Sequence, residues 1–102
     1  MSFSATAEFC SIARSNKRGK FIGEETGGGY YGNTSGKFVD TTLPNSKIII
    51  SIPTIKYIMA VRKEKFRDRG IIPDYTVTPN LNDIIENKDV QLNFAIETAR
   101  QK

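Results

Sequence analysis

A serine just before a helical pattern is the first residue in this chain whose type and position suit chemistry. Ser4 precedes a run of apolar residues at helical spacing. A nucleophilic hydroxyl there faces the backbone N–H groups of the first turn, which have no partner within the helix and can hold a developing oxyanion. The helix dipole adds partial positive charge at the same end. The alternative interpretation is a simple N-cap, the usual role of serine at this position.

A second candidate feature is the glycine run Gly27-Gly28-Gly29, followed by Tyr30. Consecutive glycines let the backbone approach another group closely or bend where a Cβ would not fit. The run lacks the GKS/T ending of a phosphate loop. We therefore expect these four residues to line a substrate groove, with a turn packed by its own aromatic rings as the alternative.

The sequence offers few general bases. Histidine is absent, and Cys10 is the single cysteine, which leaves no disulfide and no metal-ligand pair. Lys37 and Lys56 can act as surrogate bases only if burial lowers their pKa values. Each alternates with apolar neighbours, a pattern typical of a side chain that points to solvent. No cofactor is predicted.

Two longer helices and one short helix are expected to frame these residues. The first spans 5–15 and ends within Asn16 to Gly19. Near the C-terminus, Asn82 or Asp83 is predicted to cap a short helix, and Asp89 a longer one. The apolar face of the first helix consists of Ala5, Phe9, Ile12 and Ala13.

Short strands are expected between the helices. They cover 20–24, 37–43, 47–52 and 54–61. Residues 70–77 are expected to form a turn and a short edge strand, because Pro73 cannot donate to a ladder. The turn sequence Pro44-Asn45-Ser46 predicts a hairpin between 37–43 and 47–52. Helices alternating with short strands indicate the α/β class.

Length and charge narrow the function classes. The 102 residues suffice for one domain, and the longest apolar runs are too short for a membrane span. The net charge of +4 is spread along the chain and mixed with carboxylates, even in its densest run, Arg62 to Arg69. Nucleic-acid binding calls for a purer basic stripe with stacking aromatics. We therefore predict no nucleic-acid partner.

Four segments, in the right order, resemble the C-terminal processing and tricorn-like serine peptidases. Ser2 to Phe9 is similar to the family's S-F-S-A-x-x-E-F segment, and Asn16 to Gly29 resembles its R-A-x-x-(I/V)-G-E-x-T-x-G-G strand and loop. Leu43 to Pro53 resembles the L-P-(N/D)-(G/S)-x-x-(I/V)-x-(I/V)-P hairpin, and Arg69 to Val77 the x-G-(I/V)-x-P-D-x-x-V segment. Together these segments are spread over residues 2–77 of the chain.

The resemblance implies a partial ClpP- or crotonase-like α/β domain, in which residues 1–102 form the C-terminal segment of the catalytic domain. It implies Ser4 as nucleophile and the N–H of Ala5 as an oxyanion donor. The partners it implies are a peptide or protein substrate and an upstream half of the same domain, and relatives of this type are usually exported.

The chain also departs from the family pattern. Aligning Thr26 with the threonine of the processing-protease T-x-G-K loop puts Gly29 at the position of the general-base lysine. The tricorn-like branch instead takes a histidine base from the upstream half and an acid downstream. Arg67 occupies the spacing expected for that acid, which leaves Asp68 and Glu64 as substitutes or as solvated surface charges.

Two functions follow from these observations. The first is a serine peptidase. This chain carries its nucleophile and part of its substrate groove, and is expected to be inactive alone. The second is a peptidase-like domain that has lost its base and binds a peptide or hydrophobic ligand. A small basic nucleic-acid- or surface-binding protein is a more distant third.

Overall fold

The computed structural model describes residues 2–65 and 67–101. Its helices are α1 (Ser4–Ser15), α2 (Leu81–Ile85) and α3 (Val90–Arg100). Its strands are β1 (Ile22–Gly23), β2 (Gly32–Asn33), β3 (Phe38–Thr42), β4 (Ile49–Pro53), β5 (Tyr57–Ile58) and β6 (Tyr75–Thr76). Helices and short strands are thus mixed along the chain, which is the coarse α/β character expected.

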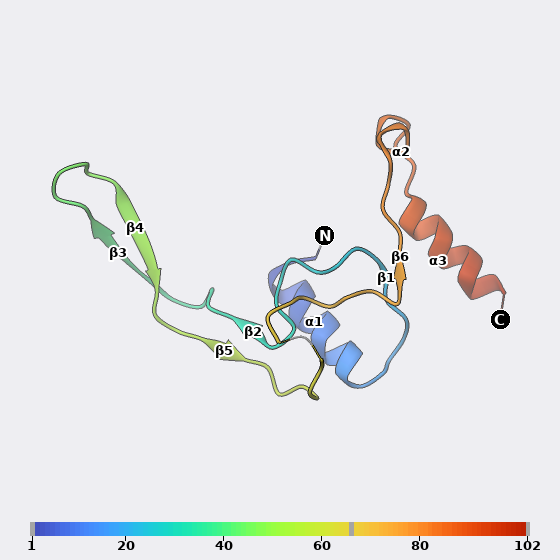
Figure 1. The fold of residues 1–102 in the computed structure, drawn as a ribbon, viewed down its shortest axis with the longest axis horizontal. Coiled ribbons are helices and arrows are strands. Elements are labelled where there is room, and N and C mark those ends of the chain that lie inside the picture. The colour runs from blue at the N-terminus through green and yellow to red at the C-terminus, as the bar shows by residue number, and fades with distance from the viewer. Residues whose placement is uncertain (1, 66, 102) are drawn as a thin grey trace.

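The strands form three separate pairs. β3 pairs with β4 and β2 with β5, both antiparallel, so the chain runs out along β2 and β3 and returns along β4 and β5 as one arm (Figure 1). β1 pairs with β6 in parallel, and α3 lies beside β1. The radius of gyration is 17.9 Å, against about 13 Å for a compact chain of 100 residues. The fold is therefore extended, with α1 between the hairpin arm and the C-terminal helices.

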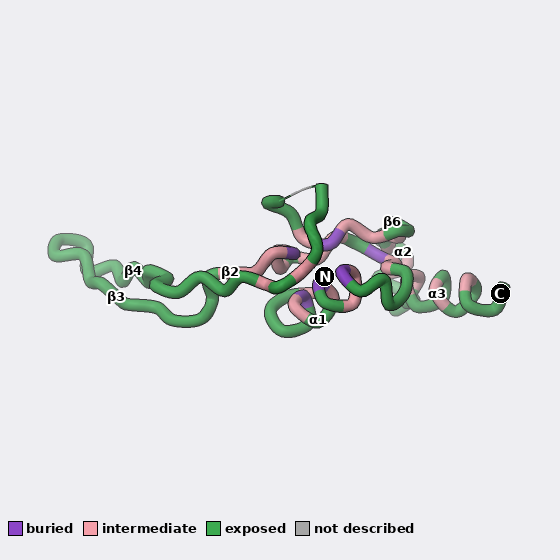
Figure 2. Tube along the Cα trace, turned by 90° about the horizontal axis from the view of Figure 1, so that it is seen from below, coloured by how far each residue is buried: buried purple, intermediate pink, exposed green. Residues whose placement is uncertain are grey.

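The small core lies along one side of α1. Ala7, Ser11 and Ser15, spaced by four residues, are buried on α1, and Tyr30 and Ile71 are buried in loops. Figure 2 shows the buried segments gathered in the middle of the molecule, around α1. Small side chains at this spacing let the loops approach the helix closely. The apolar stripe expected on α1 is largely uncovered, since Phe9 and Ile12 are 71% and 52% exposed.

Several predicted boundaries need correction. Ser4 is not a cap, because Phe3 holds the N-cap position and no side chain caps the helix. The short helix α2 is capped by Asn80 rather than Asn82 or Asp83, and Asp83 instead completes a reciprocal capping box. The strand expected over 54–61 shrinks to β5, the part that meets β2.

Other expectations are confirmed. The hairpin turn joins β3 to β4, and the Asp89 side chain caps α3 by accepting from the Leu92 N–H at 2.9 Å. Within the described residues, none of the helices has the length and apolar character needed to cross a membrane.

Candidate functional site

Ser4 and the glycine run line one pocket, with a volume of about 270 Å3. We call it the Ser4 pocket; its lining consists of Phe3, Ser4, Ala7, Glu8, Gly27, Gly28, Gly29, Asn33 and Ser35. The carbonyl of Ser2 accepts hydrogen bonds from the N–H groups of Gly27 and Gly28, at 3.0 and 3.3 Å. The loop is therefore fastened to the chain just before Ser4.

The glycines are required by this close approach. A Cβ on Gly27 would lie 2.1 Å from the Phe3 ring, and one on Gly28 would lie 2.5 Å from the Ala7 Cβ. A larger residue at position 28 must push the loop away from α1, because the Ala7 Cβ cannot move without its helix, whereas a larger residue at position 27 must displace the exposed Phe3 ring. The sequence-based expectation of a closely approaching backbone is thus met at these two positions.

Ser4 begins α1 in an unusual backbone conformation. Its φ of +49° lies in the left-handed region, which costs a non-glycine residue roughly 1–2 kcal/mol. The side chain is exposed. The first hydrogen bond of the helix is donated by the Ala7 N–H to the Phe3 carbonyl, at 3.3 Å. The N–H groups of Ala5 and Thr6 therefore precede the helical ladder and add to the positive end of the dipole.

Glu8 is a pocket residue that sequence reasoning missed. Its Oε1 accepts a 3.0 Å hydrogen bond from the Asn33 side-chain amide, which ties α1 to β2 across the pocket. It is the sole charged side chain among the described lining residues. Its position four residues after Ser4 could have predicted this placement, because residues i and i+4 lie on the same face of a helix.

Hydrogen bonds and an ion pair made by Thr26 and Glu25 hold the glycine loop in place. Thr26 Oγ1 donates to the Gly28 carbonyl and accepts from the Ile71 N–H, each at 2.8 Å. Glu25 pairs with Arg69 and also accepts from the Gly70 N–H at 2.9 Å. The Arg69 guanidinium lowers the pKa of the Glu25 carboxyl. The segment that resembles the family's fourth motif therefore serves here to position the loop.

Tyr30 does not line the Ser4 pocket. Its side chain is 2% exposed, and its hydroxyl donates to the Arg62 carbonyl at 3.0 Å. Burial raises the pKa of this phenol. Tyr30 is thus a core residue and its ring packs edge-to-face against Tyr31, as the alternative interpretation of packed aromatics expected.

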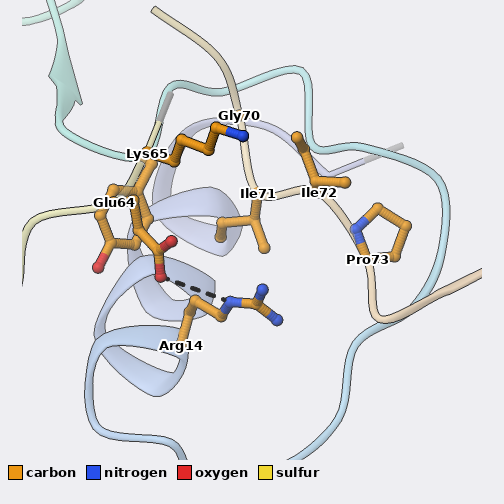
Figure 3. Close-up of a pocket in the computed structure, with 8 residues that line it drawn as sticks. Arg14, Glu64, Lys65, Gly70, Ile71, Ile72 and Pro73 are labelled. Carbon is orange, nitrogen blue, oxygen red and sulfur yellow. Dashed lines mark ion pairs between the residues drawn. The ribbon is translucent and has the colours of Figure 1, made fainter. Parts of the chain in front are cut away.

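A second pocket, of about 210 Å3, is lined by Tyr30 together with residues of α1 and of the segments 64–65 and 70–73 (Figure 3). Arg14 lines it and is neutralised by Asp74 at 3.0 Å and by Glu64 at 3.8 Å. The pKa of Asp74 is lowered, first by the Phe21 N–H that it accepts and then by Arg14 and Lys20. Pairing with two carboxylates leaves Arg14 poorly suited to bind an anion.

The two expected acids lie outside the Ser4 pocket. Glu64 lines the second pocket, together with Arg14, and Asp68 lines a third pocket together with Lys56. Lys37 and Lys56 are both exposed, as the alternation of residues predicted. The described structure therefore brings Ser4, Ala5 and the glycines together without any of the proposed bases or downstream acids. Phe66, within the charged run, lies outside the described residues.

Comparison with known proteins adds no relative. Neither a family model, nor a curated protein, nor a solved structure matches the chain.

Proposed function

We propose that this chain is the nucleophile-bearing part of a serine peptidase with a ClpP- or crotonase-like catalytic domain. The observation that carries the proposal is that Ser4, at the start of a helix, and Gly27 to Gly29 line one pocket. The four motif segments, which occur in the family's order, support the same function.

In the proposed reaction, Ser4 Oγ forms a bond to the carbonyl carbon of the scissile peptide, and its proton passes to a base. The Ala5 N–H holds the negative charge that develops on the carbonyl oxygen. The base returns the proton to the leaving amine, and water then hydrolyses the acyl-enzyme. A histidine from the upstream half is the proposed base, because this chain contains none.

Fluorophosphonate labelling with chemical rescue tests this function. The chain alone should react very slowly, because a positioned base contributes about 10²- to 10⁴-fold. High imidazole concentrations should supply the base and direct the label to Ser4. Ser4→Ala should abolish that label, while Ser35→Ala, which removes another hydroxyl from the same pocket, should retain it. Labelling spread over the exposed serines, with no response to imidazole, would refute the proposal.

A second candidate is a peptidase-like binding domain. It is favoured by the absence of lysine and histidine from the described lining of the Ser4 pocket and by the engagement of Glu8 with Asn33. If this candidate is right, a longer polypeptide that contains the segment should bind peptides equally well with Ser4→Ala and should never take up the label.

A further inference from the structure

Glu8 carries the one negative charge in the described lining of the Ser4 pocket. One oxygen of its carboxylate, Oε1, accepts the 3.0 Å hydrogen bond from the Asn33 side-chain amide. Within residues 2–65 and 67–101, Glu8 makes no ion pair, and no second group hydrogen-bonds to its carboxylate. Because the amide is neutral, no cation of the described chain compensates the charge of Glu8.

The surroundings of Glu8 strengthen the attraction of its carboxylate for a cation. Glu8 is half-buried, and Phe3 and Ala7 supply apolar lining beside it. Partial exclusion of water lowers the local dielectric constant, so opposite charges attract one another more strongly than on an open surface. The chain as a whole has a net charge of +4 and repels cations. The negative charge of this pocket is therefore a local feature that complements a positively charged ligand group.

The size of the pocket and the state of the carboxylate narrow the choice of that group. The volume of about 270 Å3 suits a single long side chain, since drug-sized ligands fill roughly 300–1,000 Å3. A guanidinium pairs best when it meets both oxygens of a carboxylate in a fork. Asn33 already holds Oε1 of Glu8, which leaves Oε2 without a partner among the described residues. A compact ammonium group, which needs only one oxygen, is the better match.

We infer that the Ser4 pocket binds a lysine side chain of a peptide, with the ammonium group on Glu8. The apolar lining by Phe3 and Ala7 suits the alkyl stem of lysine, which buries readily while its charged end is paired. Because Ser4 lines the same pocket, the lysine lies next to the peptide bond that Ser4 attacks. This last step rests on the proposed peptidase function, whereas the binding of lysine does not.

Titration of the 102-residue chain with two short peptides, both blocked at their two ends, tests the inference. One peptide contains a single lysine, and the other has norleucine at the same place, with the same alkyl chain but no ammonium group. The NMR shifts of the Gly27, Gly28 and Gly29 amides report binding in the pocket. The lysine peptide should bind about fivefold more tightly, as expected for a partly exposed ion pair. Equal binding of the two peptides overturns the inference.

Two matched variants assign the preference to Glu8. Glu8→Gln removes the charge, keeps an oxygen for the Asn33 amide and should bind both peptides equally. Glu97→Gln removes a charge from the exposed surface of α3 and should keep the preference for lysine. A preference that survives in Glu8→Gln overturns the inference. Salt gives a second test on the natural chain, where it should reduce the preference, and a preference that salt leaves unchanged contradicts an ion pair.

Two further peptides distinguish the source and the type of the cation. A norleucine peptide with a free amino terminus should bind no more tightly than the blocked one. A gain equal to that of lysine would show that the pocket takes a chain terminus, and would overturn the assignment to lysine. Replacing lysine by arginine should reduce the gain, and tighter binding of arginine would contradict the role of the single free oxygen of Glu8.

These binding measurements need no reaction at Ser4, so they separate the lysine site from the peptidase function. Lysine-selective binding in a chain whose Ser4 never takes up the fluorophosphonate label would refute the peptidase and retain the lysine site. Labelling of Ser4 in a chain that binds both blocked peptides equally would retain the peptidase and refute the lysine site.

Discussion

The Asn33 side chain reaches across the Ser4 pocket to Glu8, one helical turn after Ser4, and donates a 3.0 Å hydrogen bond to its carboxylate. This bond fastens the glycine loop and β2 to α1. Glu8→Ala should lower the free energy of unfolding by about 1–2 kcal/mol, because it leaves the partly buried amide without this acceptor. Glu8→Gln keeps an acceptor oxygen and should cost less than half as much. Urea unfolding measures both variants, and equal losses would contradict the assignment.

The left-handed backbone at Ser4 predicts that glycine at this position is more stable than alanine, the reverse of the usual order within a helix. At this position glycine should be about 1 kcal/mol more stable than alanine, since only glycine adopts a φ of +49° without strain. Thr6, in the same first turn but within the helix, is the control. There alanine should be more stable than glycine by about 1 kcal/mol. The same order of stability at both positions would show that Ser4 is unstrained.

The contact between Gly28 and Ala7 predicts a compensating pair of substitutions. Gly28→Ala introduces a Cβ only 2.5 Å from that of Ala7 and should destabilise the fold by about 1–3 kcal/mol. Ala7→Gly alone should cost about 1 kcal/mol through lost helix propensity. The double variant should be more stable than the sum of the two losses, because it removes the clash. Additive losses in a double-mutant cycle would rule out this contact.

The lowered pKa of Asp74 predicts a defined pH dependence. A carboxyl whose pKa is below its ordinary value of 3.8 in the folded state stabilises the fold above that pH, and the contribution is lost as the pH falls below it. Asp74→Asn should therefore cost about 1 kcal/mol at pH 7, and its difference from the natural chain should vanish on acidification. Unfolding at pH 7 and at a series of lower pH values, continued well below 3.8, measures this.

Glu97→Gln is the control for Asp74, because it removes one negative charge from the exposed surface of α3. It should leave the free energy of unfolding at pH 7 nearly unchanged. If it matched the loss caused by Asp74→Asn, the effect would come from net charge rather than from the bonds that Asp74 makes.

Sequence patterns predicted the parts of the fold that depend on neighbouring residues. The turn chemistry of Pro44-Asn45-Ser46 located the hairpin, and the Asp89 side chain located the start of α3. Both features rest on bonds within a few residues, which local sequence encodes. The same holds for the length of α1.

Local sequence patterns did not predict which distant segments pack against one another. Periodicity placed Phe9 and Ile12 on one apolar face of α1, whereas the side that is buried carries the smaller Ala7 and Ser11. Which side a helix buries depends on what approaches it, and the glycine loop demands small residues. The parallel pairing of β1 with β6 joins Ile22 to Tyr75, a contact that no local signal announces.

The difference between local and distant contacts also sets the order in which this chain acquires its structure. The β3–β4 hairpin closes through residues that are near neighbours in sequence, and hairpins form in about 1–10 μs. The body around α1 instead needs Thr26 to meet Ile71 and Ser15 to meet Arg62. Those encounters must first close loops of many residues, which slows the folding rate. Closure of the distant contacts that assemble the Ser4 pocket, rather than formation of the marginally stable β3–β4 hairpin, should therefore limit the refolding rate measured by stopped flow.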